Sequence, residues 1–246
     1  MASAPQQLSR HDQPAVRISG LRRSFAGQRV LDGIDIEIRK GEFLALLGRS
    51  GSGKSTILRA IAGLDEGTEG SGDIVVPERR SVLFQDSRLL PWQTVIDNVT
   101  LGSYDAGARD RAKVALREVE LSGKEGNWPR TLSGGEQQRA ALARSLVRNP
   151  ELLLADEPFS ALDALTRIRM QRLLQRLCQR HSPAVLFVTH DVEEALRLAD
   201  RVIIIADGRV SHEEHVRGVS LSPERYAATR DDILARLGLA PTDHSL

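Results

Sequence analysis

Cysteine is almost absent from this sequence, which has one, Cys178, among 246 residues. A single thiol cannot form a disulfide within the chain, so a disulfide-stabilised extracellular scaffold is excluded and a reducing compartment is favoured. The leucines Leu174 and Leu177 share a face of a predicted helix with this cysteine. That placement favours a buried, unreactive thiol over a nucleophile.

Aromatic residues and net charge are also scarce. Aromatics make up 4% of the chain, which is too few for a surface that stacks nucleic-acid bases. The 34 Lys and Arg residues nearly balance the 33 Asp and Glu residues, and the formal charge is +1. Because no field of one sign is present, the composition argues against a nucleic-acid partner and against direct attraction to an anionic membrane.

Long apolar runs are missing. None approaches the roughly 18–20 residues that a transmembrane helix needs. The longest candidates, ELLLA and RVIIIA, have the length of strands. The polar N-terminal segment lacks the apolar core of a secretory signal. These features indicate a cytosolic chain, unless another protein holds it at a membrane.

Between residues 16 and 47 the sequence shows patterns that are typical of β-strands. Ile34, Ile36 and Ile38 alternate with charged residues, which is typical of a half-buried antiparallel strand. GEFLALLG follows as a continuous apolar run, which predicts a strand buried on both faces of a sheet. The chain is therefore expected to start with an antiparallel β region that leads into a central strand.

The remaining pattern predicts the domain organisation. Residues from about 87 to 150 are mostly helical in character, and strands and helices alternate from 151 onward, with a hairpin signal in RVIIIADGRV. Such alternation is typical of an α/β fold with a mostly parallel sheet, here with the N-terminal antiparallel region and an inserted helical lobe. We predict a flexible leader at 1–15, a cassette at 16–210 and a polar C-terminal tail at 211–246.

Residues 48–56, GRSGSGKST, match the phosphate-binding pattern G-x-x-x-x-G-K-[ST] between a predicted strand and a predicted helix. Glycines let backbone N–H groups close around phosphate oxygens, and the helix N-terminus adds partial positive charge. Lys54 is expected to reach the β- and γ-phosphates, and the Ser55 hydroxyl to bind Mg²⁺. The chain is thus predicted to have a P-loop NTPase core. The expected nucleotide contacts of the loop are Gly48, Arg49, Ser50, Gly51, Ser52, Gly53, Lys54, Ser55 and Thr56.

A second apolar strand, ELLLADEP, ends in two adjacent carboxylates. Asp156 suits a Mg²⁺ ion, usually through water, and Glu157 suits a base that accepts a proton from a water beside the γ-phosphate. Nucleotide kinases and GTPases share this combination of cradle and carboxylates. The GTPase alternative is disfavoured because the sequence contains no N-K-x-D guanine-binding motif.

LSGGEQQR at 132–139 precedes a predicted helix. Ser133 at the helix N-cap and Glu136 three residues later predict a capping box. A capping box does not require the two glycines, Gly134 and Gly135. Bare backbone amides at a positive helix end are suited to an anion.

Six motifs, in this order, resemble those of ABC-type ATPase subunits, and the resemblance covers about residues 16–210. They are GRSGSGKST, LFQD, LSGGEQQR, ELLLADEP, SALD and VTHD. The resemblance implies that Gln85 of LFQD contacts the metal or the attacking water, and that His190 of VTHD hydrogen-bonds the γ-phosphate. It also implies that Phe25 stacks on adenine, where the family more often has tyrosine. The metal ligands implied are Ser55, Gln85 and Asp156.

The same resemblance implies a second copy of the chain. In the family, the LSGGE segment (here Ser133, Gly134, Gly135 and Glu136) contacts the γ-phosphate of an ATP held by the other subunit. Two chains then enclose two ATP molecules. Asp163 of SALD is expected at the interface between them.

The segment FQDSRLLPWQTVIDNV carries an apolar patch, Leu89, Leu90, Pro91 and Trp92, in a polar loop. The patch is either a plug against the local core or a docking site for a cytoplasmic helix of a permease. Together with GNWPRTLSGGE and SALDALTRIRMQ, it resembles the nitrate/sulfonate/taurine importer subfamily, and most closely its aliphatic sulfonate importers.

That resemblance implies ATP hydrolysis that drives import through separate permease subunits, at the cytoplasmic face of the inner membrane. An extracytoplasmic substrate-binding protein would be an indirect partner. The alternatives are an importer ATPase for taurine or nitrate, and a soluble ABC ATPase that is not coupled to transport.

Overall fold

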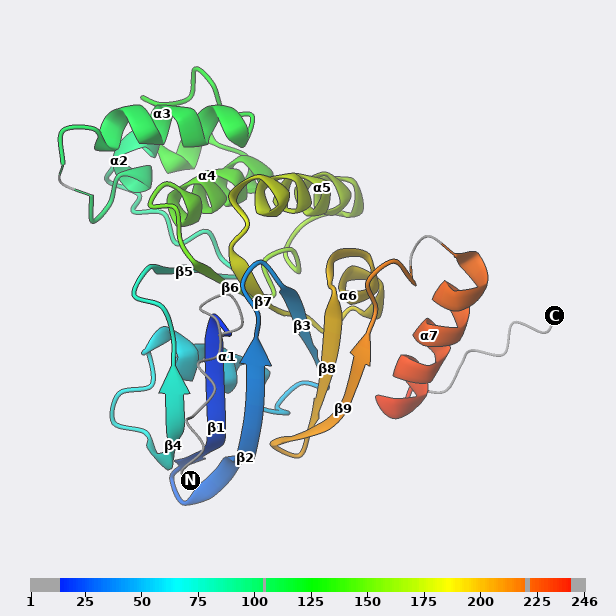
Figure 1. Ribbon diagram of the computed structural model, residues 1–246. Helices are drawn as coiled ribbons and strands as arrows, with labels where there is room; N and C mark the ends of the chain where they lie inside the picture. Colours follow the sequence, from blue (N-terminus) through cyan, green and yellow to red (C-terminus); the bar gives the residue numbers. More distant parts are fainter. Residues whose placement is uncertain (1–13, 104, 220–221, 240–246) are drawn as a thin grey trace, which may run out of the picture.

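The computed structural model describes residues 14–103, 105–219 and 222–239. The expected leader lies outside the described residues, apart from Pro14 and Ala15. Nine strands form two sheets in the described part of the chain, and helices surround the larger sheet (Figure 1). None of the helices described is both long and apolar enough to cross a membrane.

The smaller sheet is antiparallel and has the strand order β2-β1-β4. Its strands are β1 (Val16–Phe25), β2 (Gln28–Ile38) and β4 (Glu69–Val75). Ile34, Ile36 and Ile38 of β2 are at most 3% exposed, while the charged residues between them face solvent. The predicted N-terminal antiparallel region is therefore confirmed, and its buried face packs on the larger sheet and on helix α1 (Lys54–Ala62).

The larger sheet has the order β5-β6-β7-β3-β8-β9 and is parallel except for β9. Its strands are β3 (Phe43–Leu47), β5 (Arg80–Leu83), β6 (Leu152–Asp156), β7 (Ala184–Val188), β8 (Arg201–Ala206) and β9 (Arg209–His215). All five residues of β3 are buried, as its continuous apolar run predicts. Because parallel strands end at one edge of the sheet, the segments that follow β3, β5, β6 and β7 converge there.

Four helical segments lie between β5 and β6 in the chain. They are α2 (Val95–Val99), α3 (Ala108–Glu118), the 3-10 helix η1 (Pro129–Thr131) and α4 (Gly134–Leu146). In Figure 1, α2, α3 and α4 form a group at the top, beside α5 (Ala164–His181) and away from the smaller sheet. This group occupies the part of the sequence in which the helical lobe was expected.

Two segments differ from the sequence-based expectation. β4 is a strand although its sequence, EGSGDIV, is polar and rich in glycine and gives no strand signal. The expected boundary after residue 210 falls inside β9, which pairs with β8 along its length. The region 211–246 also contributes α7 (Pro223–Arg236), and its Ile233 is buried in the same core as the larger sheet. The hairpin signal in RVIIIADGRV predicts the start of β9 but not its continuation beyond residue 210, because that part is a polar edge strand held by backbone hydrogen bonds.

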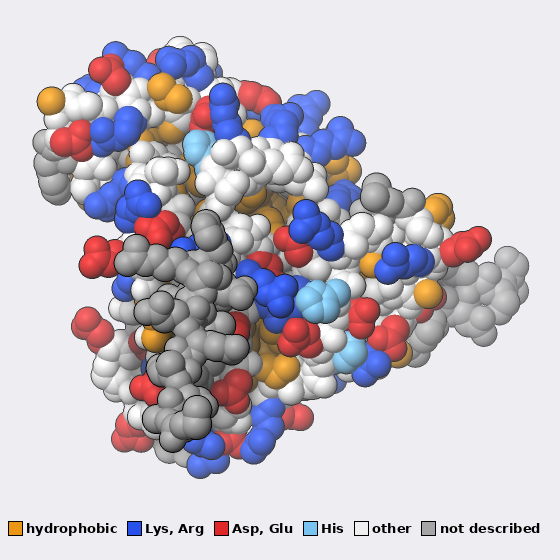
Figure 2. Space-filling view, in the orientation of Figure 1, with side chains coloured by type: hydrophobic (Ala, Val, Ile, Leu, Met, Phe, Trp, Pro, Cys, Tyr) orange, Lys and Arg blue, Asp and Glu red, His pale blue; other side chains and the backbone are white. Residues whose placement is uncertain are grey.

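The surface carries both signs of charge. Figure 2 shows Lys and Arg side chains interspersed with Asp and Glu side chains over the visible face. This mixture agrees with the formal charge of +1.

Candidate functional site

The phosphate-binding loop connects β3 to α1. The Lys54 side chain is 5% exposed, and its ammonium donates hydrogen bonds to the carbonyls of Gly48 at 2.8 Å and Arg49 at 3.0 Å. Burial lowers the pKa of Lys54, although the carboxylates of Glu157 and Asp156 oppose this shift. The lysine is therefore already inside the loop, where a phosphate chain would replace the two carbonyls as its partner.

The same loop offers further hydrogen-bond donors. The N-cap of α1 is Gly53, which has no side chain to cap the helix, so the first amide groups of α1 are left for an acceptor from outside it. The Ser52 hydroxyl oxygen is buried and has no partner among the described residues. Unpartnered donors at a positive helix end fit the phosphates of a nucleotide.

The expected metal ligands Ser55 and Asp156 lie together. Ser55 follows Lys54 in the first turn of α1, and Asp156 is the last residue of β6. The Ser55 hydroxyl donates to Asp156 Oδ1 at 2.9 Å. The described residues contain no cluster of three or more His, Cys, Asp or Glu side chains that could hold a metal alone. A hydroxyl and a carboxylate beside a phosphate site fit Mg²⁺, which usually takes few protein ligands and shares phosphate oxygens.

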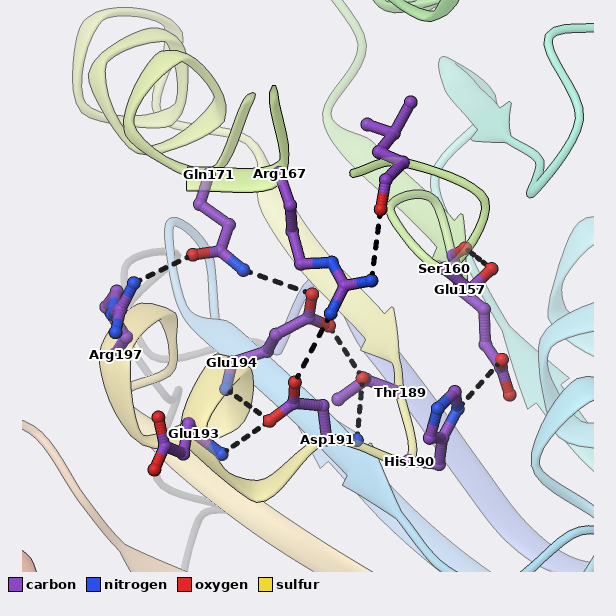
Figure 3. Close-up of polar contacts among 11 residues, drawn as sticks. Glu157, Ser160, Arg167, Gln171, Thr189, His190, Asp191, Glu193, Glu194 and Arg197 are labelled. Carbon is purple, nitrogen blue, oxygen red and sulfur yellow. Dashed lines mark hydrogen bonds and ion pairs between the residues drawn. The ribbon is translucent and has the colours of Figure 1, made fainter. Parts of the chain in front are cut away.

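Glu157 has a left-handed backbone, with φ of 44°, which is unusual for a residue other than glycine. Two contacts hold this conformation: its amide donates to the Val188 carbonyl at 2.9 Å, and the Ser160 hydroxyl donates to its carbonyl at 2.9 Å. Its carboxylate Oε2 lies 2.9 Å from His190 Nδ1 (Figure 3). A strained backbone that is pinned at both ends is typical of a functional position.

Gln85 reaches the same edge of the sheet from β5. The register of the parallel pair places Leu83 beside Ala155, so Gln85 and Glu157 each lie two residues beyond this pair. Gln85 is exposed. The structure thus brings five expected site residues to one edge: Lys54 and Ser55 after β3, Gln85 after β5, Asp156 and Glu157 at the end of β6.

Phe25 lies at the end of a strand of the smaller sheet and not in the phosphate-binding loop. It ends β1 and is 46% exposed. No hydrogen bond among the described residues ties its backbone to the phosphate-binding loop. Its ring is accessible to a planar ligand.

The LSGGE segment forms the capping box that the sequence predicts. The Ser133 hydroxyl accepts from the Glu136 amide at 3.3 Å, and the Ser133 amide donates to Glu136 Oε2 at 2.9 Å. The bond from the Ser133 backbone lowers the pKa of Glu136. A Cβ atom on Gly135 would lie 2.7 Å from the Thr166 methyl group, whereas one on Gly134 would meet nothing within 4 Å. Packing within the chain therefore explains Gly135 but not Gly134.

This segment lines an open groove of about 560 Å³. Asp163, which caps α5 by accepting from the Leu165 and Thr166 amides, lies on the same groove. Those hydrogen bonds, from Thr166 above all, lower the pKa of Asp163. The groove is also lined by four arginines: Arg139, Arg169, Arg172 and Arg176. Three carboxylates, Glu120, Glu136 and Asp163, line the groove as well, and Glu120 pairs with Arg176 at 2.8 Å. The groove therefore carries a small excess of positive charge.

The apolar patch after Gln85 has two halves. Leu89 is half-buried and packs against the core that the helical lobe shares with the larger sheet, and Leu90 is half-buried too. Pro91 and Trp92 are exposed, and Trp92 keeps 69% of its surface open to solvent. The leucines thus anchor the loop, and the tryptophan projects from it.

Sequence reasoning missed the residue that holds this loop. The buried side chain of Asn98 donates to the carbonyls of Leu90, Gln93 and Thr94 at 3.0–3.1 Å and accepts from the Leu90 amide at 2.7 Å. These four bonds fix the backbone on both sides of Trp92. The only sequence signal is a polar residue between the apolar Ile96 and Val99 of a predicted helix.

A buried hydrogen-bonded group beside His190 was also missed by the sequence reasoning (Figure 3). The Thr189 hydroxyl donates to Glu194 Oε2 at 2.7 Å, and Gln171 of α5 donates to Glu194 Oε1 at 3.0 Å. Glu194 belongs to α6 (Val192–Leu198), and its burial raises its pKa. The group joins α5 to the turn that carries His190. Its signal in the sequence is a glutamate on the apolar face of a helix.

Comparison with known proteins gives consistent results. A family model described as "ABC transporter" matches residues 31–160. The chain is 60% identical to aliphatic sulfonates import ATP-binding protein SsuB 2 of Nocardia farcinica, over 91% of this chain and 95% of that protein. It is 63% identical to the protein of the same name from Streptomyces avermitilis, over 85% of this chain and 83% of that protein.

Two solved structures are also similar. The dimeric ATP-binding cassette MJ0796, in a post-hydrolysis state bound to ADP and Pi, aligns with a TM-score of 0.70 at 33% identity, over 82% of this chain and 99% of that chain. The cbiO1 protein from Clostridium perfringens aligns with a TM-score of 0.77 at 24% identity, over 92% of this chain and 98% of that chain. The second match concerns the fold alone.

Proposed function

The chain belongs to the ABC transporter family, and on that premise we propose that it is the ATP-hydrolysing motor subunit of an importer for aliphatic sulfonates. The observation that carries the motor role is the convergence of Lys54, Ser55, Asp156 and Glu157 at one edge of the sheet. The names of the relatives that are 60% and 63% identical support the substrate class.

ATP binding starts at the phosphate-binding loop. Lys54 exchanges its bonds to the loop carbonyls for phosphate oxygens, and the first amides of α1 bind the same phosphates. Mg²⁺ supplies positive charge that offsets the charge of the phosphates. Ser55, Asp156 and Gln85 would hold this ion, and Phe25 would stack on the adenine.

Hydrolysis is assigned to Glu157, His190 and Gln85. The Glu157 carboxylate orients a water beside the γ-phosphate and accepts its proton as the oxygen attacks phosphorus and the bond to ADP breaks. His190 is hydrogen-bonded to Glu157, so it keeps the carboxylate oriented. Its ring would also hydrogen-bond the γ-phosphate. The strained backbone of Glu157 aims this side chain away from the line of β6.

A second copy of the chain completes each site. Ser133, Gly134, Gly135 and Glu136 would contact the γ-phosphate bound by the partner, with Asp163 at the interface. Two features support this arrangement: the open face of Gly134 on a groove lined by arginines, and the dimeric state of the cassette MJ0796. The four arginines of the groove outnumber its three carboxylates, so a small positive excess is available to a phosphate that approaches from outside.

Transport requires further partners. The exposed Trp92, with Leu89, Leu90 and Pro91 behind it, forms the proposed docking site for a membrane permease. Permease contacts would hold the subunit at the cytoplasmic face of the inner membrane. An extracytoplasmic substrate-binding protein delivers the sulfonate to the permease and does not touch this chain.

The Glu157→Gln variant tests the motor role. It should bind ATP normally, lose about 10²- to 10⁴-fold in hydrolysis because the amide cannot take the proton, and accumulate as ATP-bound dimers. Size-exclusion chromatography with and without ATP, alongside phosphate release, measures both effects. Near-normal ATP turnover by this variant would show that Glu157 is not the base.

Growth and copurification test the transport role. A strain without this chain should fail to grow on an aliphatic sulfonate as the sole sulfur source and should still grow on sulfate. Only the wild-type chain, and not Glu157→Gln, should restore growth. If the strain instead lost growth on taurine or nitrate, the substrate assignment would be wrong and the motor role would stand. Failure to copurify with any membrane permease would favour a soluble ABC ATPase.

A further inference from the structure

One buried side chain of the helical lobe contacts both strand ends that carry the proposed hydrolytic residues. Gln138 lies in α4 and is 3% exposed. Its side-chain nitrogen donates to the carbonyl of Phe84 at 3.0 Å and to the carbonyl of Pro158 at 2.9 Å. Phe84 immediately precedes Gln85, and Pro158 immediately follows Glu157.

The chemistry of this contact is specific to a primary amide. A planar amide nitrogen carries two N–H donors, and each is used on a different carbonyl. An apolar side chain of the same volume would fill the space but leave both carbonyls without this donor, and burying unpaired polar groups is costly. The two acceptors belong to segments 54 and 20 residues away, so the contact is a tertiary clamp and not a local cap.

The neighbouring Gln137 provides a contrast within the same helix. Its side-chain nitrogen also donates to two carbonyls, those of Pro129 at 3.2 Å and Leu132 at 3.3 Å. Both acceptors belong to the helical lobe itself. Gln137 Oε1 also accepts from the Ser87 hydroxyl at 3.3 Å, in the segment that follows Gln85. Among the described residues, however, Gln138 is the residue of α4 that donates to the carbonyls next to Gln85 and Glu157.

We propose that Gln138 is a positioning residue for ATP hydrolysis, which sets the separation between the backbones that carry Gln85 and Glu157. α4 begins at the LSGGE segment and reaches Gln138 one turn later. A rigid helix moves as a unit, so a shift of the segment that meets the partner's nucleotide is passed to both strand ends. The inference rests on the proposed function, because it assigns Gln85 and Glu157 to hydrolysis.

The test compares Gln138→Met with the matched control Gln137→Met in the full-length chain. Each change removes two hydrogen bonds to carbonyls and keeps a side chain of similar length. Gln137→Met also removes the bond that Ser87 donates to Gln137, so the control loses at least as many contacts as the test variant. For Gln138→Met we expect kcat to fall on the order of 10- to 100-fold while KM for ATP stays within about threefold, because binding is intact and only alignment is lost. For Gln137→Met we expect kcat within about twofold of wild type.

A double-mutant cycle with Gln85→Ala separates positioning from general destabilisation. If Gln138 acts through the placement of Gln85, the second change should cost much less in the Gln85→Ala background than in wild type. Additive losses would overturn the proposal, and so would a Gln138→Met enzyme with unchanged kcat.

A second variant keeps the test decisive if Gln138→Met does not fold. Gln138→Asn retains both N–H donors, so it should keep the fold, but its arm is one methylene shorter and misplaces the two donors. It should therefore lower kcat more than Gln137→Met does, again at constant KM. Equal loss of kcat in Gln138→Asn and Gln137→Met would contradict a specific role. An inactive Glu157→Gln enzyme beside a fully active Gln138→Met enzyme would overturn this inference alone, whereas an active Glu157→Gln enzyme would overturn the proposed function.

Discussion

Replacing Trp92 by alanine should separate ATP hydrolysis from transport. The side chain projects from the loop that follows Gln85, and Asn98 fixes the backbone on both sides of it. Trp92 lies seven positions after Gln85, so one ordered loop joins the proposed metal contact to the proposed permease contact. Removing the tryptophan leaves the loop and the nucleotide site in place.

The exposure of Trp92 sets the size of the effect. An aromatic side chain of this size buries up to about 250 Å², and Trp92 is 69% exposed, which leaves roughly 170 Å² for a partner to cover. At ~25 cal/mol/Å² this area corresponds to at most about 4 kcal/mol. Truncating a central interface residue typically costs about 2–4 kcal/mol. The Kd for the permease should therefore weaken by about 30- to 1,000-fold.

Three measurements on the Trp92→Ala variant check this prediction. The free energy of unfolding should stay within about 0.5 kcal/mol of wild type, because an exposed side chain contributes little to the folded core. ATP hydrolysis by the isolated chain should be unchanged. Copurification with the permease in detergent, and uptake of a labelled aliphatic sulfonate by cells, should both fall.

Leu64→Ala is the control, because Leu64 is 54% exposed and lies in the turn after α1, outside the docking loop. It should leave assembly and uptake intact. If Trp92→Ala assembled and transported like wild type, the patch would serve only to pack the loop. If the variant lost ATP hydrolysis or stability instead, the tryptophan would belong to the fold and not to an interface.

Three further predictions concern the dimer, the thiol and a buried carboxyl. Mixing Ser133→Arg chains with Lys54→Ala chains should give ATP-dependent heterodimers with one intact site, while neither variant dimerises alone. If size-exclusion chromatography showed dimers of Ser133→Arg alone, the LSGGE segment would serve only as a helix cap. Burial raises the pKa of Cys178 to about 12, so about one thiol in 10⁴ is ionised at pH 8. An aromatic disulfide reagent should therefore react roughly 10³-fold more slowly with the folded chain than with the unfolded chain. Comparable rates for the two states would contradict this prediction. Burial also raises the pKa of Glu194 above its ordinary value of 4.5, so the folded state binds this proton more tightly and the resulting stability is present below about pH 4.5 and is lost as the pH rises through the raised pKa. Denaturant titrations at a series of pH values should show this decline in the free energy of unfolding for wild type but not for Glu194→Gln. If the two proteins declined in parallel, another group would be responsible for the pH dependence.

Much of the fold was predictable because its signals are local. The buried strand β3, the capping box of Ser133 and Glu136, and the hairpin at Asp207-Gly208 each depend on a few adjacent residues. Their hydrogen bonds or side-chain periodicity are complete within one turn or one strand. The carboxylates at the end of ELLLAD were placed correctly at a strand end for the same reason.

β4 shows where local signals stop. Its Gly72 has φ of 101°, and a Cβ atom there would lie 2.6 Å from Leu21 Cα of β1. Glycine is required because β1 approaches so closely, yet in the sequence the same glycine indicates a turn. The strand exists only because β1 supplies its hydrogen-bonding partners.

By itself the sequence determined the chemistry available to this protein: the phosphate-binding loop, two carboxylates at a strand end, and a helix that starts with bare amides. Only the tertiary structure decided which side chains set the geometry of that chemistry. Gln138 and Asn98 are ordinary polar residues in the sequence, and both are buried in the structure as clamps on backbone carbonyls. The carbonyls that Gln138 holds are 20 and 54 residues away. Helix and strand signals repeat within a few residues, whereas a clamp of that span exists only once α4 has packed against the sheet.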